Sequence, residues 1–467
     1  MPPLDRKPRG DALPGRRIDA GPGRRDIAAM PSTSWGYRAA VRIGAALAPA
    51  LGLVDRKVGD GHRQRRGAAA RLSAWAAGER DTARPLAWFH AASVGEGLQA
   101  ESVLLELRRL VPRCQLVYTH FSPSAEPLAR RLIVDAADYL PYDLPDAADR
   151  LLGALAPDLL VFSKLDLWPE LATRAASAGT TVALVAATVS AGSGRLRWPA
   201  RALLRAGYEA VSAAGAIAEA DAERLARLGV PPEQIRVLGD PRFDSVAARV
   251  AAVPPDEPLL RFGRGAPTLV AGSTWPRDEA VLLEAFARVR IRAPEARLIL
   301  VPHEPTVDHL AALDRRAARA GLPAPARLST AEGPAPLLVV DRVGVLATLY
   351  GAGTMAYVGG GFGRAGLHSV LEPAAWGVPV TFGPNWHNSR DAELLLRGGA
   401  AEALRRGAGS PRDGVVLAER WEQWIVDESS RMAQGGRARA IVSEGLGAAR
   451  RSAEMLAGLI SSRSPRR

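Results

Sequence analysis

A run of small residues that ends in a carboxylate is the first candidate for chemistry in this sequence. It reads His90-Ala-Ala-Ser-Val-Gly-Glu96, follows a short apolar stretch and opens a helical pattern. Small residues let a backbone approach a ligand closely, and a glutamate at such a place can act as a general base toward an acceptor hydroxyl. A glutamate in a first helical turn also complements the helix dipole. From its position alone, Glu96 is therefore either a catalytic base or a residue that stabilises the helix start.

The second candidate is the glycine-rich run Gly359-Gly-Gly-Phe-Gly-Arg-Ala-Gly366, which lies between an apolar stretch and a helical pattern. Residues 361–366 satisfy the G-x-G-x-x-G pattern of dinucleotide sites, but no acidic residue follows about 20 positions later at the end of a strand. A glycine-rich turn before a helix binds anions through its free N–H groups. We therefore favour a sugar-nucleotide phosphate here, with charge added by Arg364, over NAD or a plain structural turn. Glu372 is then placed to hydrogen-bond ribose hydroxyls.

Two shorter loops carry further polar groups. Gly272-Ser273-Thr274 can form another anion-binding nest, and Pro302-His303-Glu304 ends a later apolar stretch. The histidines in these loops do not pair at metal-ligand spacing, so we expect no metal and no cofactor, and leaving-group charge has to be met by backbone amides and cations. The sequence has no G-x-S-x-G or Walker A motif, which argues against hydrolases and nucleoside triphosphatases.

Regularly alternating elements separate these loops. Strands are predicted in the first half of the chain at Leu86–His90, Leu116–Tyr118, Leu159–Phe162 and Val182–Ala186, and helices at Leu98–Leu110, Ala147–Leu155 and Leu171–Ala178. Strands are predicted in the second half at Leu269–Ala271, Leu298–Val301, Leu338–Val340, Ala356–Val358 and Val378–Thr381. Such alternation with short loops indicates parallel sheets covered on both faces. We predict an α/β fold of two Rossmann-like domains that face a cleft, where ligands bind at the carboxyl ends of the strands.

The predicted domain division follows the pauses in this alternation. Prolines at positions 254, 255 and 258 mark a linker between the two sheets. The predicted parts are a disordered basic tail over 1–34, a membrane-interfacial segment over 35–66, a first domain over 67–250, the linker over 251–265 and a second domain over 266–467. The chain start is open at this point, since either Met1 or Met30 can begin it.

The overall charge narrows the class of partner. The chain has 467 residues with 61 Lys and Arg against 49 Asp and Glu, a net charge of +12. Such an excess suggests nucleic acid, acidic lipid headgroups or phosphorylated substrates, although a GC-rich genome that favours arginine explains it equally well. The basic residues are not interleaved with aromatics, so nucleic acid is not expected. A single cysteine, Cys114, excludes a disulfide framework and fits a reducing cytoplasm.

An apolar stretch near the N-terminus suggests contact with a membrane. It runs from Ile43 to Val54, with Trp35, Tyr37 and several arginines, Arg65 among them, on its flanks. Twelve helical residues rise about 18 Å, which is short of the roughly 20 residues that cross a bilayer. We favour an anchor that lies in the interface among anionic headgroups. The alternative is a helix buried on the protein's own core.

Taken in order, these motifs resemble those of the bacterial 3-deoxy-D-manno-octulosonic acid (Kdo) transferases, which have a GT-B fold. The matching runs cover roughly residues 37 to 460. They are Trp88–Glu96, Leu140-Pro-Tyr-Asp143, Leu167-Trp-Pro169, Gly239-Asp-Pro-Arg-Phe-Asp244, Gly272-Ser-Thr-Trp275, Val358–His368, Leu371-Glu-Pro-Ala374 and Gly383-Pro-Asn385. The short N-terminal apolar segment also looks like the family's membrane anchor.

The resemblance implies an inverting, metal-independent transfer of Kdo from CMP-Kdo to a lipid A precursor, lipid IVA, in lipopolysaccharide biosynthesis. It places the enzyme at the cytoplasmic face of the bacterial inner membrane, with acceptor binding in the first domain and CMP-sugar binding in the second. Glu96 matches the general base and Arg242 a transition-state cation. The positions that match substrate or CMP contacts are Ser93, Gly272, Ser273, Pro302, His303, Val343, Gly344, Val345, Gly361, Gly363, Arg364, Gly366, His368, Ser369, Val370, Leu371, Glu372 and Asn388.

Two departures from the common family pattern change the charge of the expected site. Lys164 stands where an acidic residue with a stabilising role is common, although Asp166 remains acidic and a second family pattern also carries lysine. His303 stands where the family has an arginine of the nucleotide site, which removes a bidentate, always-charged donor. Two alternatives therefore stay open. One is another GT-B enzyme, such as a lipid A disaccharide synthase or an epimerase, and the other is a catalytically silent membrane-bound scaffold that binds a CMP-sugar.

Overall fold

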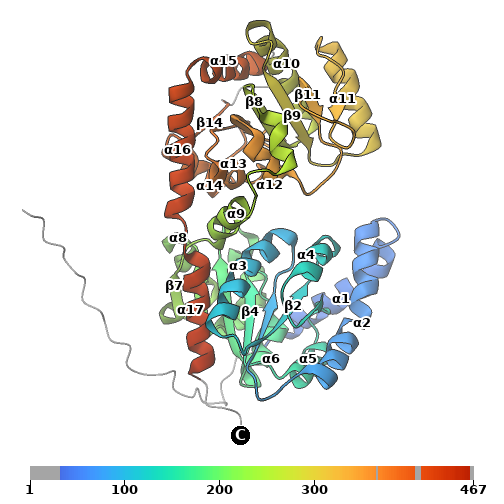
Figure 1. The fold of residues 1–467 in the computed structure, drawn as a ribbon. Coiled ribbons are helices and arrows are strands. Elements are labelled where there is room, and N and C mark those ends of the chain that lie inside the picture. Colours follow the sequence, from blue (N-terminus) through green and yellow to red (C-terminus); the bar gives the residue numbers. More distant parts are fainter. Residues whose placement is uncertain (1–31, 364–365, 405–411, 463–467) are drawn as a thin grey trace, which may run out of the picture.

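The computed structural model describes residues 32–363, 366–404 and 412–462 and folds them around two parallel sheets (Figure 1). Each sheet has seven strands, in the order β3-β2-β1-β4-β5-β6-β7 for the first and β10-β11-β9-β8-β12-β13-β14 for the second. Neighbouring strands are parallel throughout, as in the pairs β1–β4 and β8–β12. The predicted α/β fold with two Rossmann-like parallel sheets is confirmed.

The strands are short and most of them are buried on both faces. Those of the first sheet are β1 (Leu86–His90), β2 (Gln115–His120), β3 (Ala136–Tyr139), β4 (Leu159–Ser163), β5 (Thr181–Ala187), β6 (Ala213–Ala216) and β7 (Ile235–Val237). Those of the second are β8 (Thr268–Thr274), β9 (Arg297–Pro302), β10 (Ala326–Arg327), β11 (Leu337–Val339), β12 (Met355–Val358), β13 (Val380–Phe382) and β14 (Ala401–Ala403).

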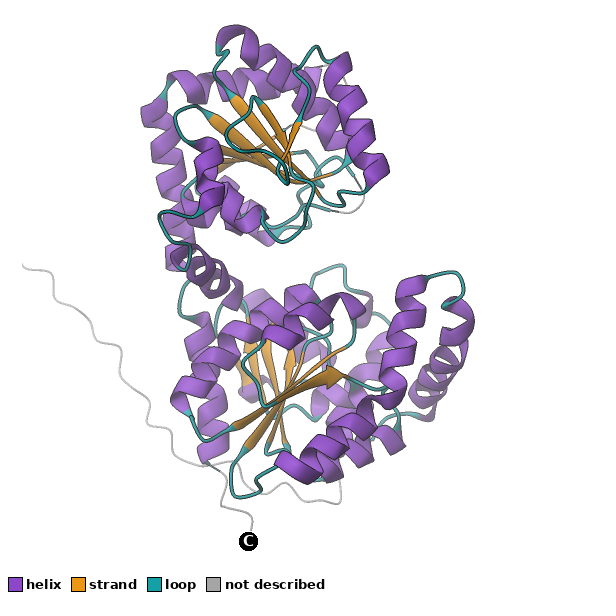
Figure 2. Ribbon diagram, turned by 45° about the vertical axis from the view of Figure 1, so that its right-hand side comes forward, coloured by secondary structure: helices purple, strands orange, loops and turns teal. Residues whose placement is uncertain are grey.

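Helices surround each sheet (Figure 2). Up to the start of the second sheet they are α1 (Trp35–Leu51), α2 (Arg56–Glu79), α3 (Val94–Leu110), α4 (Glu126–Arg131), α5 (Pro145–Leu155), α6 (Pro169–Ser177), α7 (Ala200–Glu209), α8 (Glu219–Leu228) and α9 (Pro241–Ala251). Those that follow are α10 (Pro276–Arg292), α11 (Val307–Arg319), α12 (Leu346–Leu349), α13 (Leu371–Trp376), α14 (Arg390–Arg397), α15 (Arg412–Val426), α16 (Glu428–Glu444) and α17 (Ala448–Ser461). Short 3-10 turns lie at Pro123–Ala125, Gly194–Leu196, Pro232–Gln234, Pro258–Gly263 and Tyr350–Ala352.

Strand β1 shows why the first sheet is buried on both faces. All five of its residues are buried, and their side chains alternate between two hydrophobic clusters, as the period of two in a strand requires. Leu86 and Trp88 pack in the cluster that includes residues of α2, α5 and α6. Ala87 and Phe89 pack in the cluster that includes residues of α3 and α17. A strand covered on both sides has a continuous apolar sequence, which is why this one was predictable.

The last helix of the described chain, α17, returns to the first domain. In Figure 1 it runs beside α3 in the lower half of the molecule, whereas α16 lies along the upper half. Ala449, Ala453 and Leu456 share a buried cluster with Phe89 of β1. The predicted second domain over 266–467 includes α17, but the helix packs on the first sheet. The chain therefore passes between the two sheets twice, through α9 and through the junction of α16 with α17.

The predicted membrane-interfacial segment forms α1 and the first half of α2, which fold back on each other. The turn between them is tight because Gly52 and Gly59 meet, and a Cβ at Gly52 would lie 2.6 Å from the Gly59 Cα. The N-terminal end of α1 is fixed to the first domain by Tyr37, whose hydroxyl donates to the Asp143 carboxylate at 2.7 Å. Arg38 likewise binds the buried Glu170 carboxylate at 2.8 Å.

The remaining length of α1 carries apolar side chains that point into solvent. The exposed residues are Ile43, Leu47 and Leu51 in α1, and Leu53 and Val54 in the turn that follows it. Arg65, which the sequence grouped with the headgroup-binding arginines, is instead buried, because its guanidinium stacks 3.4 Å from the centre of the Phe121 ring. No helix in the described ranges is long and apolar enough to cross a membrane.

Candidate active site

The carboxylate of Glu96 lies just beyond the carboxyl end of β1, where it closes the first turn of α3. Its Oε2 accepts from the Ser93 backbone N–H at 3.1 Å and from the Ser93 hydroxyl at 2.9 Å. Glu96 and Ser93 thus form a capping box, so the helix-stabilising role considered from the sequence is real. The other oxygen, Oε1, is not used by the cap and lies 3.7 Å from the Lys164 ammonium. The capping contacts therefore leave half of the carboxylate for other chemistry.

Lys164 and Asp166 complete a charged cluster beside Glu96. Lys164 follows β4 with a φ of 63°, a left-handed conformation that is uncommon outside glycine. Its backbone N–H donates to the Val185 carbonyl at 2.8 Å, which ties the strained residue to β5. The pKa of Asp166 is raised, first by burial and then by the negative charge of Glu96. The structure thus brings Ser93, Glu96, Lys164 and Asp166 together at the carboxyl ends of β1 and β4.

The histidine at the end of β1 is a core residue. The His90 ring is fully buried, and its Nδ1 lies 3.1 Å from the Thr119 hydroxyl. Burial, together with the nearby His120, lowers the pKa of His90 to about 3, so the ring is neutral at physiological pH. It packs edge-on against Trp168, with ring centres 5.8 Å apart. His90 supports the loop that carries Glu96 and is not available as an acid or base.

Arg242 lies at the start of α9 and is bound on two sides. Its Nε donates to Asp240 at 2.8 Å, and its Nη1 donates to Asp391 of α14 at 2.7 Å. Burial acts to lower the pKa of Arg242, but the two carboxylates outweigh burial and raise it. Within the described residues, no hydrogen bond or ion pair joins Arg242 to Glu96 or Lys164. In this conformation its guanidinium therefore connects α9 to α14.

The glycine-rich turn after β12 is held by one buried carboxylate. The Oδ2 of Asp278, at the start of α10, accepts from the backbone N–H of Gly360 at 3.0 Å and of Trp275 at 2.9 Å. Its Oδ1 accepts from the Tyr357 hydroxyl at 2.9 Å. Burial raises the pKa of Asp278, and these three donors act against that rise. Asp278 therefore fixes the turn relative to the N-terminus of α10.

Three aromatic rings stack beside this turn. The ring centres of Trp275 and His303 lie 4.8 Å apart, and those of His303 and His368 lie 4.5 Å apart. The Trp275 indole N–H donates to Nε2 of His368 at 3.1 Å, so this nitrogen has no proton of its own. Burial and then His303 lower the pKa of His368 to about 4. The stack therefore holds His368 as a neutral imidazole whose proton is on Nδ1.

The other predicted CMP contacts gather around the same end of the second sheet. Gly272 lies against Tyr350, whose hydroxyl would be 2.1 Å from a Cβ at this position. Gly366, with a φ of 85°, lies against the side chain of Asn388. Ser273 has a left-handed φ of 52° at the end of β8. The remaining described positions are Pro302 and His303 at the end of β9, Val343, Gly344 and Val345 before α12, Gly361 and Gly363 in the turn, and Ser369, Val370 and Leu371 at the start of α13. Arg364 lies outside the described residues.

Glu372, expected at the ribose, is paired with an arginine. Its Oε1 lies 3.2 Å from Nη1 of Arg249 on α9. Burial raises the pKa of Glu372, and the Arg249 charge opposes that rise. The Glu372 side chain keeps 21% of its surface exposed.

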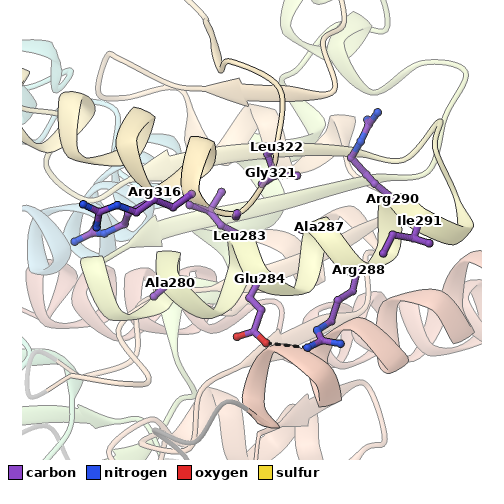
Figure 3. Close-up of a pocket in the computed structure, with 12 residues that line it drawn as sticks. Ala280, Leu283, Glu284, Ala287, Arg288, Arg290, Ile291, Arg316, Gly321 and Leu322 are labelled. Carbon is purple, nitrogen blue, oxygen red and sulfur yellow. Dashed lines mark hydrogen bonds and ion pairs between the residues drawn. The ribbon is translucent and has the colours of Figure 1, made fainter.

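The predicted CMP contacts that the structure describes thus form one group in the second domain. The Glu96 cluster forms another group in the first domain. No described hydrogen bond or ion pair connects the two groups. In residues 32–363, 366–404 and 412–462, no three His, Cys, Asp or Glu side chains are arranged to hold a metal ion. A separate cavity of about 840 Å³ lies between α10 and α11 (Figure 3). Its walls include Leu283, Ile291 and Leu322 but none of the predicted site residues.

Comparison with known proteins identifies the family. The family model for 3-Deoxy-D-manno-octulosonic-acid transferase (kdotransferase) matches residues 62–245. A 3-deoxy-D-manno-octulosonic acid transferase of Bordetella pertussis is 32% identical over 394 residues, which cover 79% of this chain and 86% of the relative. The chain belongs to the Kdo transferase family. The transferase of the same name from Haemophilus influenzae is 26% identical over 314 residues, covering 66% of this chain and 73% of that one.

Solved structures agree with the fold of this Kdo transferase. The UDP-GlcNAc 2-epimerase of Neisseria meningitidis, bound to UDP-GlcNAc, superposes with a TM-score of 0.54 at 12% identity over 77% of this chain and 98% of that one. The S. aureus MnaA–UDP structure gives a TM-score of 0.52 at 10% identity over 80% and 94%. At such identities the likeness concerns the fold alone, which is GT-B. The predicted family, fold and glycosyltransferase activity are confirmed.

Sequence reasoning missed several residues that support the candidate site of this Kdo transferase. Trp275 and Asp278 were not among the predicted contacts, although an acidic residue three positions after a helix start is a recognisable capping signal. Asp391 and Arg249 were also missed, because the residues that they bind are 149 and 123 positions away along the chain. No local pattern in the sequence reports such pairs.

Proposed function

We propose that this Kdo transferase moves Kdo from CMP-Kdo to lipid IVA, a lipid A precursor, with inversion at the anomeric carbon. The observation that carries the proposal is the Glu96 carboxylate, with one oxygen engaged in the helix cap and the other turned toward Lys164 at 3.7 Å. Because the Glu96 side chain is already held in place, little side-chain conformational entropy is lost when an acceptor hydroxyl approaches. The membership of the family supports the sugar that is transferred.

In the proposed reaction, the acceptor hydroxyl attacks the anomeric carbon of Kdo and gives its proton to Glu96. The bond between that carbon and the phosphate oxygen of CMP breaks, and CMP leaves with the electron pair. Backbone N–H groups of the glycine-rich turn and of Ser273 are proposed to bind the phosphate. Arg242 is the proposed cation for the transition state, and to reach it the guanidinium would have to give up one of its two carboxylate partners. No metal is required by this scheme.

The proposed place of reaction is the cytoplasmic face of the bacterial inner membrane. The support is the exposed apolar surface of α1 and of the turn after it, where Leu53 is 90% and Val54 is 92% exposed. Contiguous exposed apolar side chains of this kind mark an interaction surface. An interfacial helix buries such a face among acyl chains, and anionic headgroups fit the net charge of +12.

The deciding experiment is an assay with CMP-Kdo generated in situ, lipid IVA and folded protein in detergent. CMP release together with a Kdo-lipid product supports the proposal. Absence of both would refute it and leave the silent scaffold, whereas CMP release that depends on a different acceptor would favour another GT-B transferase. For the location, Leu47→Ser together with Leu51→Ser should move protein from the membrane to the supernatant fraction. Substitution of these exposed residues leaves the Tyr37 and Arg38 contacts of α1 in place.

A further inference from the structure

The loop before α7 exposes a tryptophan between arginines. Trp198 is 85% exposed, which is unusual for the largest apolar side chain. The segment from Ser190 to Tyr208 contains four arginines and no acidic residue. It is therefore a strongly basic stretch that presents an aromatic ring to its surroundings.

Two of the four arginines bind other groups of the protein and two do not. Arg195 donates to the Leu165 carbonyl at 2.8 Å and approaches Asp166 at 3.4 Å. Arg205 binds Glu209 at 2.6 Å. Arg197 and Arg201 are exposed, and their side chains have no hydrogen-bond or ion-pair partner among the described residues. These two charges are free to bind an anionic surface.

The loop lies between the N-terminal end of α1 and the Glu96 cluster. On one side, a Cβ at Gly36 of α1 would lie 3.6 Å from Leu203 of α7, and the neighbouring Trp35 is 81% exposed. On the other side, Arg195 reaches Asp166, whose pKa is raised in part by Glu96. The exposed tryptophan and its arginines therefore lie on the element that packs beside the exposed Trp35 end of α1, and Arg195 of the same loop reaches the charged cluster of the proposed base.

We infer that Arg197, Trp198 and Arg201 form a second membrane-contacting element that binds anionic phospholipid headgroups beside α1. The inference rests on the membrane location proposed above. Tryptophan prefers the headgroup level of a bilayer, where its ring is half buried and its N–H remains hydrated. Arginines near an anionic surface gain electrostatic energy. An acidic protein would satisfy the arginines alone, but the two exposed tryptophans, Trp198 and Trp35 at the neighbouring end of α1, favour a bilayer.

A second point of contact has a consequence for the enzyme. One helix lying in an interface leaves the protein free to turn about that helix. Attachment at α1 and at the Trp198 loop removes this freedom and fixes the orientation of the first domain, which carries Glu96, on the bilayer.

The test is co-sedimentation of the full chain with vesicles of phosphatidylethanolamine and phosphatidylglycerol, and with neutral phosphatidylcholine vesicles. Arg197→Gln with Arg201→Gln should weaken binding to the anionic vesicles roughly 30-fold, which corresponds to about 1 kcal/mol for each arginine. Binding to neutral vesicles should be unchanged. The matched control is Arg315→Gln with Arg319→Gln on α11, a pair that is also exposed, four residues apart and without a described partner.

A second variant tests the aromatic ring. Trp198→Ser should weaken binding to both kinds of vesicle roughly fivefold, because a partly buried aromatic side chain contributes about 1 kcal/mol. The control is Ile291→Ser, since Ile291 is 81% exposed on α10. If wild-type protein binds and the loop variants bind equally well, or if the control pair loses as much, the inference is wrong while the membrane location stands. If wild-type protein binds neither kind of vesicle, the membrane location is wrong as well.

Discussion

Replacement of Glu96 by glutamine separates its two roles in this structure. The capping box needs an acceptor at Oε2 for the Ser93 N–H and hydroxyl, and a glutamine carbonyl oxygen accepts both. The ion pair to Lys164 is lost, but the Lys164 side chain is 44% exposed, so the loss is at most about 1 kcal/mol. The variant should therefore fold with nearly the wild-type free energy of unfolding.

Turnover should respond quite differently from stability. A glutamine cannot take the acceptor proton, and loss of a general base costs about 100-fold to 10,000-fold in rate, or roughly 3–5 kcal/mol of activation free energy. We expect this loss in Kdo-lipid formation, with CMP binding by calorimetry unchanged. The matched variant is Ser93→Ala, which removes a capping hydroxyl and keeps the carboxylate. It should lose about 0.5–2 kcal/mol of unfolding free energy, and because the base is kept it should lose much less turnover than Glu96→Gln, even though Ser93 is also a predicted substrate contact.

If Glu96 is the base, Glu96→Gln loses turnover but little unfolding free energy, and Ser93→Ala loses unfolding free energy but less turnover. Glu96→Gln with turnover within threefold of wild type would show that the base lies elsewhere, with Asp166 as the next carboxylate in the cluster. Equal losses of stability and turnover in the two variants would reduce Glu96 to a helix cap.

Three further perturbations address the supports of the site. Arg242→Gln leaves the Asp391 and Asp240 carboxylates without their cation and should lower the free energy of unfolding in urea by about 3–5 kcal/mol, whereas Arg242→Lys should recover part of it. Asp278→Ala should lower the free energy of unfolding by roughly 3 kcal/mol, because three buried donors lose their acceptor. Asp278→Asn, whose amide oxygen still accepts from two N–H groups, should lower it by less than half as much. The pKa of His368, about 4 in the folded chain against 6.5 unfolded, means that the unfolded state binds more protons between these values. Urea unfolding should therefore show stability falling as pH drops from 6.5 to 4, and His368→Gln should flatten that fall.

Long apolar strands were predictable because they are covered on both faces. Leu86–His90 was predicted with the bounds that the structure has, and the other predicted strands fall on β2, β4, β5, β8, β9, β11, β12 and β13. Strands β3 and β6 were missed because their sequences, Ala-Ala-Asp-Tyr and Ala-Ala-Gly-Ala, have no β-branched residue. The missed β7, β10 and β14 are two or three residues long, and each contains a charged residue. Such strands form only because a neighbouring strand pairs with them.

The burial of Arg65 could have been read from the sequence with the right periodicity. Gly61, Arg65, Ala68, Leu72 and Ala76 recur at helical spacing, and all five lie on the buried face of α2. The prediction instead placed Arg65 among the headgroup-binding arginines, because so many basic residues follow the apolar stretch. By contrast, the pairing of Arg242 with Asp391 depends on how the two domains meet, and the charge balance of the site could not be obtained from motifs alone.

The return of α17 to the first sheet affects how the chain is made. Ala449, Ala453 and Leu456 complete one face of the hydrophobic core around β1, yet residues 448–461 leave the ribosome only after the whole second sheet has been made. Nascent domains usually fold in order from the N-terminus, but here the first domain stays unfinished on one face until the second sheet and α17 have been synthesised. During that interval its exposed apolar surface is a site for chaperone capture, and a nonsense mutation just before α17 would damage the first domain although it lies beyond the codons of the second sheet.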